Sequence, residues 1–135
     1  MMLLQCLGVM GGVYIPATEP SVSTVTVSTL SSGSCSGTHV GTQAVVRASY
    51  TFANADFTAY TAKVYKDNVL RQTITSGSTT HDDYTAPGVS GDPHNSTTYH
   101  WVWRVDMVRN ADNKVISTKT AATFTDSFGD CSGPA

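Results

Sequence analysis

The alternation of side chains from Tyr99 to Met107 constrains the fold of this chain more than any other feature. The large apolar residues fall on one face of the predicted strand: Tyr99, Trp101, Trp103, Val105 and Met107. His100, Arg104 and Asp106 fall on the other face, as expected of a strand with one buried side. Burial of each large apolar side chain is worth roughly 1.5–3 kcal/mol. The pattern therefore predicts a core strand of a packed β domain.

Other alternating or β-branched segments predict six further short strands. We place them at residues 21–30, 44–52, 60–64, 69–74, 81–84 and 115–124, with 81–84 as an edge strand. Asp67-Asn68 is predicted to form a tight hairpin turn, and residues 31–41 a Gly/Ser loop. Because helical periodicity is absent, about seven strands at this spacing predict an all-β, antiparallel sandwich.

Length and charge limit the classes of protein to which the chain can belong. Its 135 residues fit one domain. Only 13% of the residues are charged, against about 25% in typical domains, and a surface rich in Ser and Thr is expected to be virion-like or extracellular. The net charge of −2 and the scattered Lys and Arg disfavour nucleic-acid binding.

The chain divides into an apolar N-terminal docking arm (1–19), a β-sandwich domain (20–126) and a Gly/Ser-containing tail (127–135). The arm lacks the basic start of a signal peptide, and its apolar stretch is too short for a membrane span. An apolar arm without periodicity is expected to pack on its own domain or on a neighbour. The residues predicted to dock are Leu3, Leu4, Val9, Val13, Tyr14 and Ile15.

Two segments resemble fibronectin type III and related immunoglobulin-like modules. Residues 97–105 (TTYHWVWRV), followed by a turn and a Thr-rich last strand, are similar to the second half of such a module, and residues 59–70 are similar to its C to C′ region. The resemblance covers about residues 20–125 and implies an immunoglobulin-like sandwich. It also implies that Tyr99 enters strand F and bonds back across a corner. Tyr50 departs from the family, which often has Trp in strand B.

The three cysteines, Cys6, Cys35 and Cys131, have no zinc-binding spacing. Cys35 and Cys131 lie in similar Gly/Ser settings, so either a disulfide between them or three free thiols is compatible with the sequence. Residues 129–134 (GDCSGP) resemble the nucleophile loop of chymotrypsin-like proteases with cysteine as nucleophile. Only four residues follow Cys131, too few for a specificity pocket, so no catalytic residue is predicted.

Three further patterns are weighed against simpler explanations. His81, Asp82 and Asp83, with Asp92 and His94, supply types of metal ligand, but they lack the regular spacing of a calcium loop, and we favour a solvated polar loop without metal. Trp101 and Trp103 are expected to pack in the core rather than to stack on sugars. Residues 95–97 match an N-glycosylation acceptor that is expected to be unused.

The function predicted is that of a non-enzymatic virion structural protein without cofactors. The hypothesis is a bacteriophage capsid-decoration or tail-associated protein, because such particles use immunoglobulin-like modules. The partners would be other virion proteins or copies of the same chain, with weak host-surface contact through the loops of residues 79–95. Apolar burial of the arm would anchor the sandwich. The alternative is a secreted adhesion or carbohydrate-binding module of a cell surface or an extracellular filament.

Overall fold

The computed structural model describes residues 18–37, 40–42, 44–84 and 96–129, and the regular structure in them is entirely antiparallel β. The strands are β1 (Ser21–Ser31), β2 (Ser34–Gly37), β3 (Val40–Thr42), β4 (Val45–Ala53), β5 (Tyr60–Lys66), β6 (Val69–Ile74), β7 (Thr80–Tyr84), β8 (Ser96–Trp101), β9 (Trp103–Arg109), β10 (Lys114–Thr120) and β11 (Phe124–Gly129). None of the described residues forms a helix that could cross a membrane.

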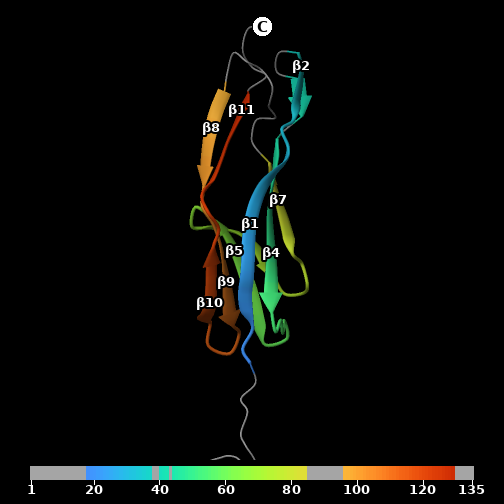
Figure 1. Ribbon diagram of the computed structural model, residues 1–135. Helices are drawn as coiled ribbons and strands as arrows, with labels where there is room; N and C mark the ends of the chain where they lie inside the picture. Colours follow the sequence, from blue (N-terminus) through green and yellow to red (C-terminus); the bar gives the residue numbers. More distant parts are fainter. Residues whose placement is uncertain (1–17, 38–39, 43, 85–95, 130–135) are drawn as a thin grey trace, which may run out of the picture.

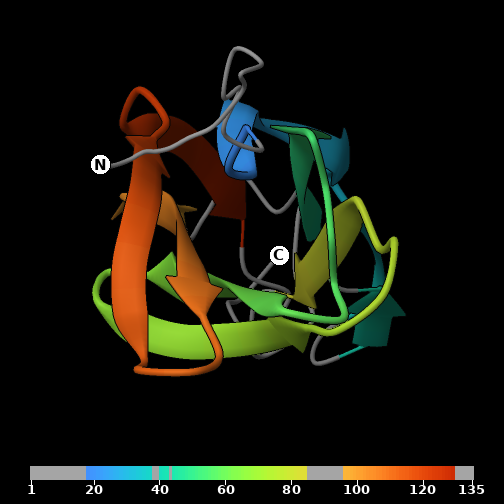
Figure 2. The same ribbon diagram turned by 90° about the horizontal axis from the view of Figure 1, so that it is seen from below.

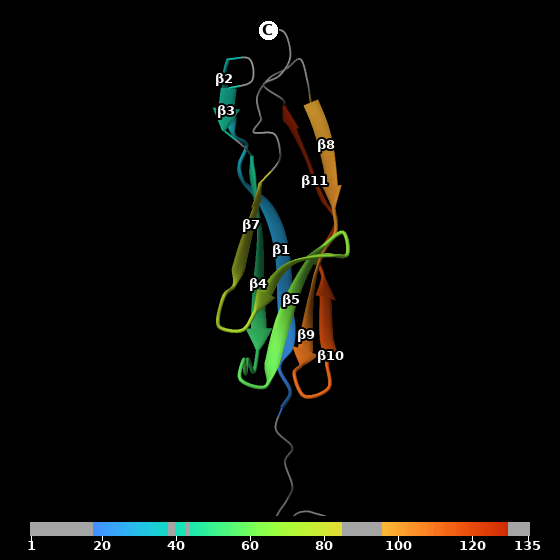
Figure 3. The same cartoon turned by 180° about the vertical axis from the view of Figure 1, so that it is seen from behind.

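Two sheets face each other across the interior in a sandwich-like arrangement. One sheet has the order β1-β4-β7 and the other has the order β10-β9-β5-β6 (Figures 1 and 3). The pairs β8–β11 and β2–β3 extend the body at the end opposite the start of β1. Seen along the long axis in Figure 2, the strands surround a single interior. The predicted all-β, antiparallel class is confirmed.

The hairpin between β5 and β6 is confirmed at the predicted turn. Asp67 and Asn68 both have positive φ, at 50° and 65°. A two-residue loop with positive φ at both positions matches the right-handed twist of the flanking strands, and Asn and Asp tolerate this backbone conformation better than most side chains. The turn aligns Lys66 with Val69 and sets the register of the hairpin.

The predicted core strand over residues 99–107 is divided at Val102. Residues before it form β8 and pair with β11, whereas residues after it form β9 and pair with β5 and β10. Val102 projects outward, and its N–H and C=O both bond to Asp67 at 2.8 Å. Asp67 therefore satisfies the backbone N–H and C=O of Val102, which in a continuous strand would bond to a neighbouring strand.

The predicted faces of this segment are confirmed with one exception. Trp103, Val105 and Met107 are fully buried, and Tyr99 and Trp101 are partly buried. Asp106 was expected on a solvated face but is also buried. There it accepts hydrogen bonds from the Thr118 hydroxyl and from Arg104 Nε, the latter at 3.1 Å. A buried carboxylate is tolerated because donors on its own strand and on β10 satisfy it.

The last predicted strand is also divided, into β10 and β11, with the break at residues 121–123. This break lies opposite Val102, because the Ala121 N–H bonds to the Trp103 carbonyl at 3.0 Å. The half of this long hairpin that is next to its turn, β9 and β10, belongs to the four-stranded sheet. The outer half, β8 and β11, forms a separate ribbon. The two divisions, together with β2 and β3, explain why the described residues contain eleven strand segments rather than the seven predicted.

Residues 31–41 differ from the expected loop. Within their described part, β2 and β3 pair as a small antiparallel hairpin, with Ser34 opposite Thr42. The sequence did not predict this hairpin, because the segment is rich in Gly and Ser, which are poor strand formers. Its strands depend on packing against neighbouring segments, which the local sequence does not show.

The buried side chains form two clusters, one above the other along the sandwich. The larger lies between the two main sheets and contains Val22, Val25, Ala48, Tyr50, Ala62, Val64, Ile74, Trp103, Val105 and Met107. The smaller lies under the β8–β11 ribbon and contains Ala44, Val46, Phe124 and Phe128. Val27 and Trp101 pack against both clusters and join them.

Candidate functional site

The residues predicted to dock, Leu3 to Ile15, lie outside the described residues, but the point where the arm joins the sandwich is described. We call this point the arm root and define it as residues 18–20 with their contacts on the β9–β10 hairpin. Pro20 is buried, while Thr18 and Glu19 are exposed. The root lies beside the β9–β10 turn, at the end of the body away from the β8–β11 ribbon (Figure 1).

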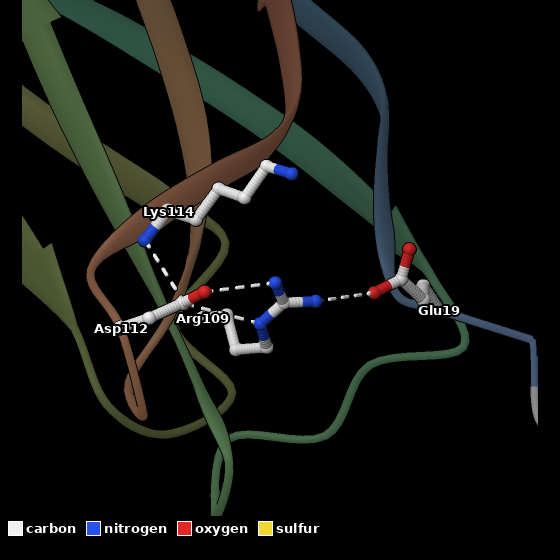
Figure 4. Close-up of polar contacts among 4 residues, drawn as sticks. All are labelled: Glu19, Arg109, Asp112 and Lys114. Atoms are coloured by element: carbon white, nitrogen blue, oxygen red, sulfur yellow. Dashed lines mark hydrogen bonds and ion pairs between the residues drawn. The ribbon is translucent and has the colours of Figure 1, made fainter.

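Arg109 connects the arm root to the β9–β10 hairpin. Its Nη1 donates to Glu19 Oε2 at 3.1 Å, while Nε and Nη2 donate to the two carboxylate oxygens of Asp112 at 3.1 and 2.9 Å (Figure 4). Asp112 Oδ1 also accepts the Lys114 N–H at 3.3 Å. The hydrogen bonds from Arg109 lower the pKa of Asp112. The guanidinium therefore links Glu19, which lies just before β1, to the β9–β10 turn.

A second polar cluster ties the two sheets together at the opposite seam, where β6 and β7 are the edge strands. Asp83 on β7 is 5% exposed and accepts from Lys66 Nζ on β5 and from Arg71 Nη2 on β6, the latter at 2.6 Å. The Lys66 ammonium also lies 4.0 Å from the centroid of the Trp101 ring. One carboxylate thus pairs with two cations in a largely dehydrated place.

The metal hypothesis for His81, Asp82 and Asp83 is not supported by this geometry. Asp82 accepts two bonds from Arg47, at 2.6 and 2.9 Å, and both oxygens of Asp83 bind cations. No group of three metal-ligating side chains occurs in the described ranges, and Asp92 and His94 lie outside them. The edge strand predicted at residues 81–84 is confirmed as β7. The favoured alternative to a metal site, a solvated loop, is therefore wrong for this part, and Asp83 is buried.

Acid is expected to unfold the protein partly through Asp83. Burial raises its pKa, but the hydrogen bonds and charges of Lys66 and Arg71 outweigh that effect and leave the pKa below its ordinary value. A carboxylate with a lowered folded-state pKa stabilises the fold above its unfolded pKa of about 3.9, and this stabilisation is lost as pH falls through the folded pKa.

The measurement is the free energy of unfolding between pH 7 and 2, for the wild type and for Asp83→Asn. The wild type should lose stability more steeply below about pH 4. Parallel curves for the two proteins would show that Asp83 does not titrate in this way. Burial also lowers the pKa of His81. Stability linked to His81 is therefore lost as pH falls below about 6.5. Because the Asp83 charge raises the pKa of His81, the two proteins are compared by their slopes below about pH 4.

The two tryptophans do not form an exposed platform for sugars. Trp103 is fully buried, which confirms its predicted place in the core, and its ring lies 6.0 Å from that of His81. Trp101 is partly buried and stacks on Phe124, with the ring centroids 5.6 Å apart. The Trp103 indole N–H has no hydrogen-bond partner within the described part of the chain.

Tyr99 does not make the cross-corner bond that the immunoglobulin-like resemblance implied, as far as the described residues extend. Its ring instead lies 5.0 Å from Trp101 and 5.8 Å from Phe128, between centroids, in the smaller core cluster. Cys35 lies in β2, and Cys131 lies outside the described residues. The choice between a Cys35–Cys131 disulfide and free thiols therefore stays a prediction.

A groove opens between β1 and the segment that connects β10 to β11. It has a volume of about 570 Å³, and Val25, Val27, Thr29, Ala121, Phe124 and Asp126 are among its lining residues. The Thr29 hydroxyl donates to Asp126 Oδ2 at 2.5 Å within the lining. Sequence reasoning missed this groove, because its lining comes from β1 and from the break in the last hairpin, which lie far apart in the sequence.

Comparison of the chain with protein-family models, with curated proteins and with solved structures finds no match.

Proposed function

We propose that this protein is a non-enzymatic structural component of a virion, a bacteriophage capsid-decoration or tail-associated protein held in place by its N-terminal arm. The observation that carries the proposal is the contrast in charge along the chain. Residues 1–18 contain no Asp, Glu, Lys or Arg, and the first charged side chain, Glu19, is bound at the exposed arm root. An uncharged apolar segment beside a polar body favours burial in a partner.

The proposal includes an immunoglobulin-like, fibronectin type III-like topology. Assigning β1, β4 and β7 as strands A, B and E, and β5, β9 and β10 as C, F and G, matches the described strand orders to the two sheets of such a sandwich. The edge strand β6 pairs with β5 rather than with β7, as expected of a C′ strand. These pairings support the topology, although fold alone does not establish function.

Deletion of residues 1–15 is expected to leave a folded sandwich that no longer joins its particle. Burial of only two of the six docking side chains would contribute about 3 kcal/mol, which is on the order of a hundredfold in affinity. Tagged full-length and deleted chains would be produced alongside the particles, and their recovery with purified particles compared. Far-ultraviolet circular dichroism of the deleted chain would check its fold.

Equal recovery of the two chains would overturn the proposal. Mass spectrometry of the chain recovered from particles provides an independent check, because the anchoring residues must still be present there. An N-terminus processed beyond Ile15 would instead favour the alternative of a secreted adhesion or carbohydrate-binding module.

A further inference from the structure

We propose that the groove between β1 and residues 121–126 receives a short segment of the N-terminal arm (residues 1–17) of a second copy of this chain, so that copies join head to tail. This inference rests on the proposed function, because it assumes that the arm is the docking element. It adds the location of the receiving surface and the identity of the partner.

The two strands that flank the groove each have a free edge. Among the described residues, β1 is hydrogen-bonded only to β4 within its sheet, and β11 only to β8. Below the groove the seam is closed, since the Val22 N–H bonds to the Ser117 hydroxyl of β10 at 3.1 Å. Farther along, β1 and β11 are linked again by the bond from the Thr29 hydroxyl to Asp126 Oδ2 at 2.5 Å, and an added strand would displace this bond. An edge strand with unpaired N–H and C=O groups is a template for an added strand.

The chemistry of the groove suits the arm. Among the described residues, its lining combines apolar side chains, including Val25, Val27 and Phe124, with four threonines and one charged residue, Asp126, which is bound by Thr29. The arm carries no charged side chain up to Thr18. An uncharged segment loses little hydration energy on entering such a groove, whereas a charged one would have to leave its charges unpaired.

The position of the arm root favours a second copy over the same chain. Arg109 holds Glu19 at the end of the body beside the β9–β10 turn, and the groove runs from Val25 toward the other end. An arm filling the groove of its own chain would have to reverse direction at the root. In a head-to-tail stack the arm instead enters the next copy directly and runs parallel to β1.

The reach of the arm is sufficient for this arrangement. In extended form residues 1–17 span about 55 Å, whereas the eleven residues of β1 span about 36 Å. Because the arm and the groove are different surfaces, the contact between copies is heterologous. A linear stack of copies has a free arm at one end and a free groove at the other. Such contacts produce rings or filaments rather than closed dimers.

The test uses two full-length variants that each damage one half of the contact. Thr26→Lys with Thr123→Lys places cations in the groove at two exposed positions, and Leu3→Asp with Leu4→Asp and Val9→Asp places charges in the arm. Thr73→Lys with Thr75→Lys is the matched control, because it adds the same charge at exposed positions outside the groove. Sedimentation velocity over a range of concentrations gives the size of each species.

We expect the wild type and the control to form species larger than a monomer in a concentration-dependent way. Each damaging variant alone should raise the apparent dissociation constant by at least about tenfold. An equimolar mixture of the groove and arm variants should form a dimer and nothing larger, since one protein supplies an intact arm and the other an intact groove.

Two results would overturn this inference: a wild type that stays monomeric at every concentration, or a groove variant that assembles like the control. The failure of the proposed function is distinguishable in the particle experiment. If the wild type stays monomeric in sedimentation but is recovered with particles, while the chain without residues 1–15 is not, the arm docks elsewhere and the proposed function stands. If the chain without residues 1–15 is also recovered, both proposals fail.

Discussion

Replacement of Trp103 by alanine is expected to lower the free energy of unfolding by about 3–5 kcal/mol, in the range measured for large-to-small changes in cores. The side chain is fully buried, and it begins β9 at the point where the chain leaves the ribbon for the four-stranded sheet. Its removal would leave a cavity between the sheets, where close packing allows only partial collapse. Urea-induced unfolding followed by circular dichroism measures the loss.

Two controls make this prediction specific. Trp101→Ala should cost less, because Trp101 is only partly buried. Trp103→Phe should restore part of the loss, since it refills some of the cavity and removes an indole N–H that has no partner among the described residues. A Trp103→Ala protein whose free energy of unfolding falls by less than about 1 kcal/mol would contradict the expected contribution of Trp103 to core packing.

Replacement of Asp83 by asparagine is expected to cost about 3–5 kcal/mol, because it leaves the cation of Lys66 buried without a counter-charge. The Lys66 side chain is 15% exposed, so water can hydrate the ammonium only in part. Arg71 is more exposed and would lose less. Chemical denaturation at pH 7 measures the change, with the midpoint and the slope determined separately.

The neighbouring residue provides a matched control for this charge effect. Asp82→Asn breaks an ion pair with Arg47 whose side chains are 29% and 38% exposed, respectively, and exposed pairs of this kind are worth about 0–1 kcal/mol. The double variant Asp83→Leu with Lys66→Met should recover much of the loss, because it removes both buried charges. Equal effects of Asp83→Asn and Asp82→Asn would show that the Lys66 site is well hydrated.

Local patterns in the sequence were sufficient for most strands. Alternation of side chains predicted β1, β4 and β5, and Asp67-Asn68 predicted the β5–β6 turn, because these signals depend on residues a few positions apart. The buried face of Trp103, Val105 and Met107 followed from the same alternation. Such local signals are reliable where the backbone conformation that they favour and the face that they bury are both those of the final fold.

The same patterns could not predict where a strand changes partner. Residues 99–107 alternate without interruption, yet the strand divides at Val102, because Asp67, 35 positions away, takes the backbone bonds of that residue. The arm root was missed for the same reason, since Glu19 and Arg109 are 90 positions apart. The docking residues of the arm were predicted from composition and remain a prediction.

By itself, the sequence determined that this chain is built from antiparallel strands, which segments form them and which side chains are large enough to fill a core. These properties follow from side-chain alternation and turn chemistry, which act over a few residues. Only the tertiary structure decided the sheet orders, the ion cluster around Asp83, the binding of Glu19 by Arg109 and the groove beside β1. These features depend on contacts between distant segments, and no local pattern encodes which edges meet or part when the sheets pack.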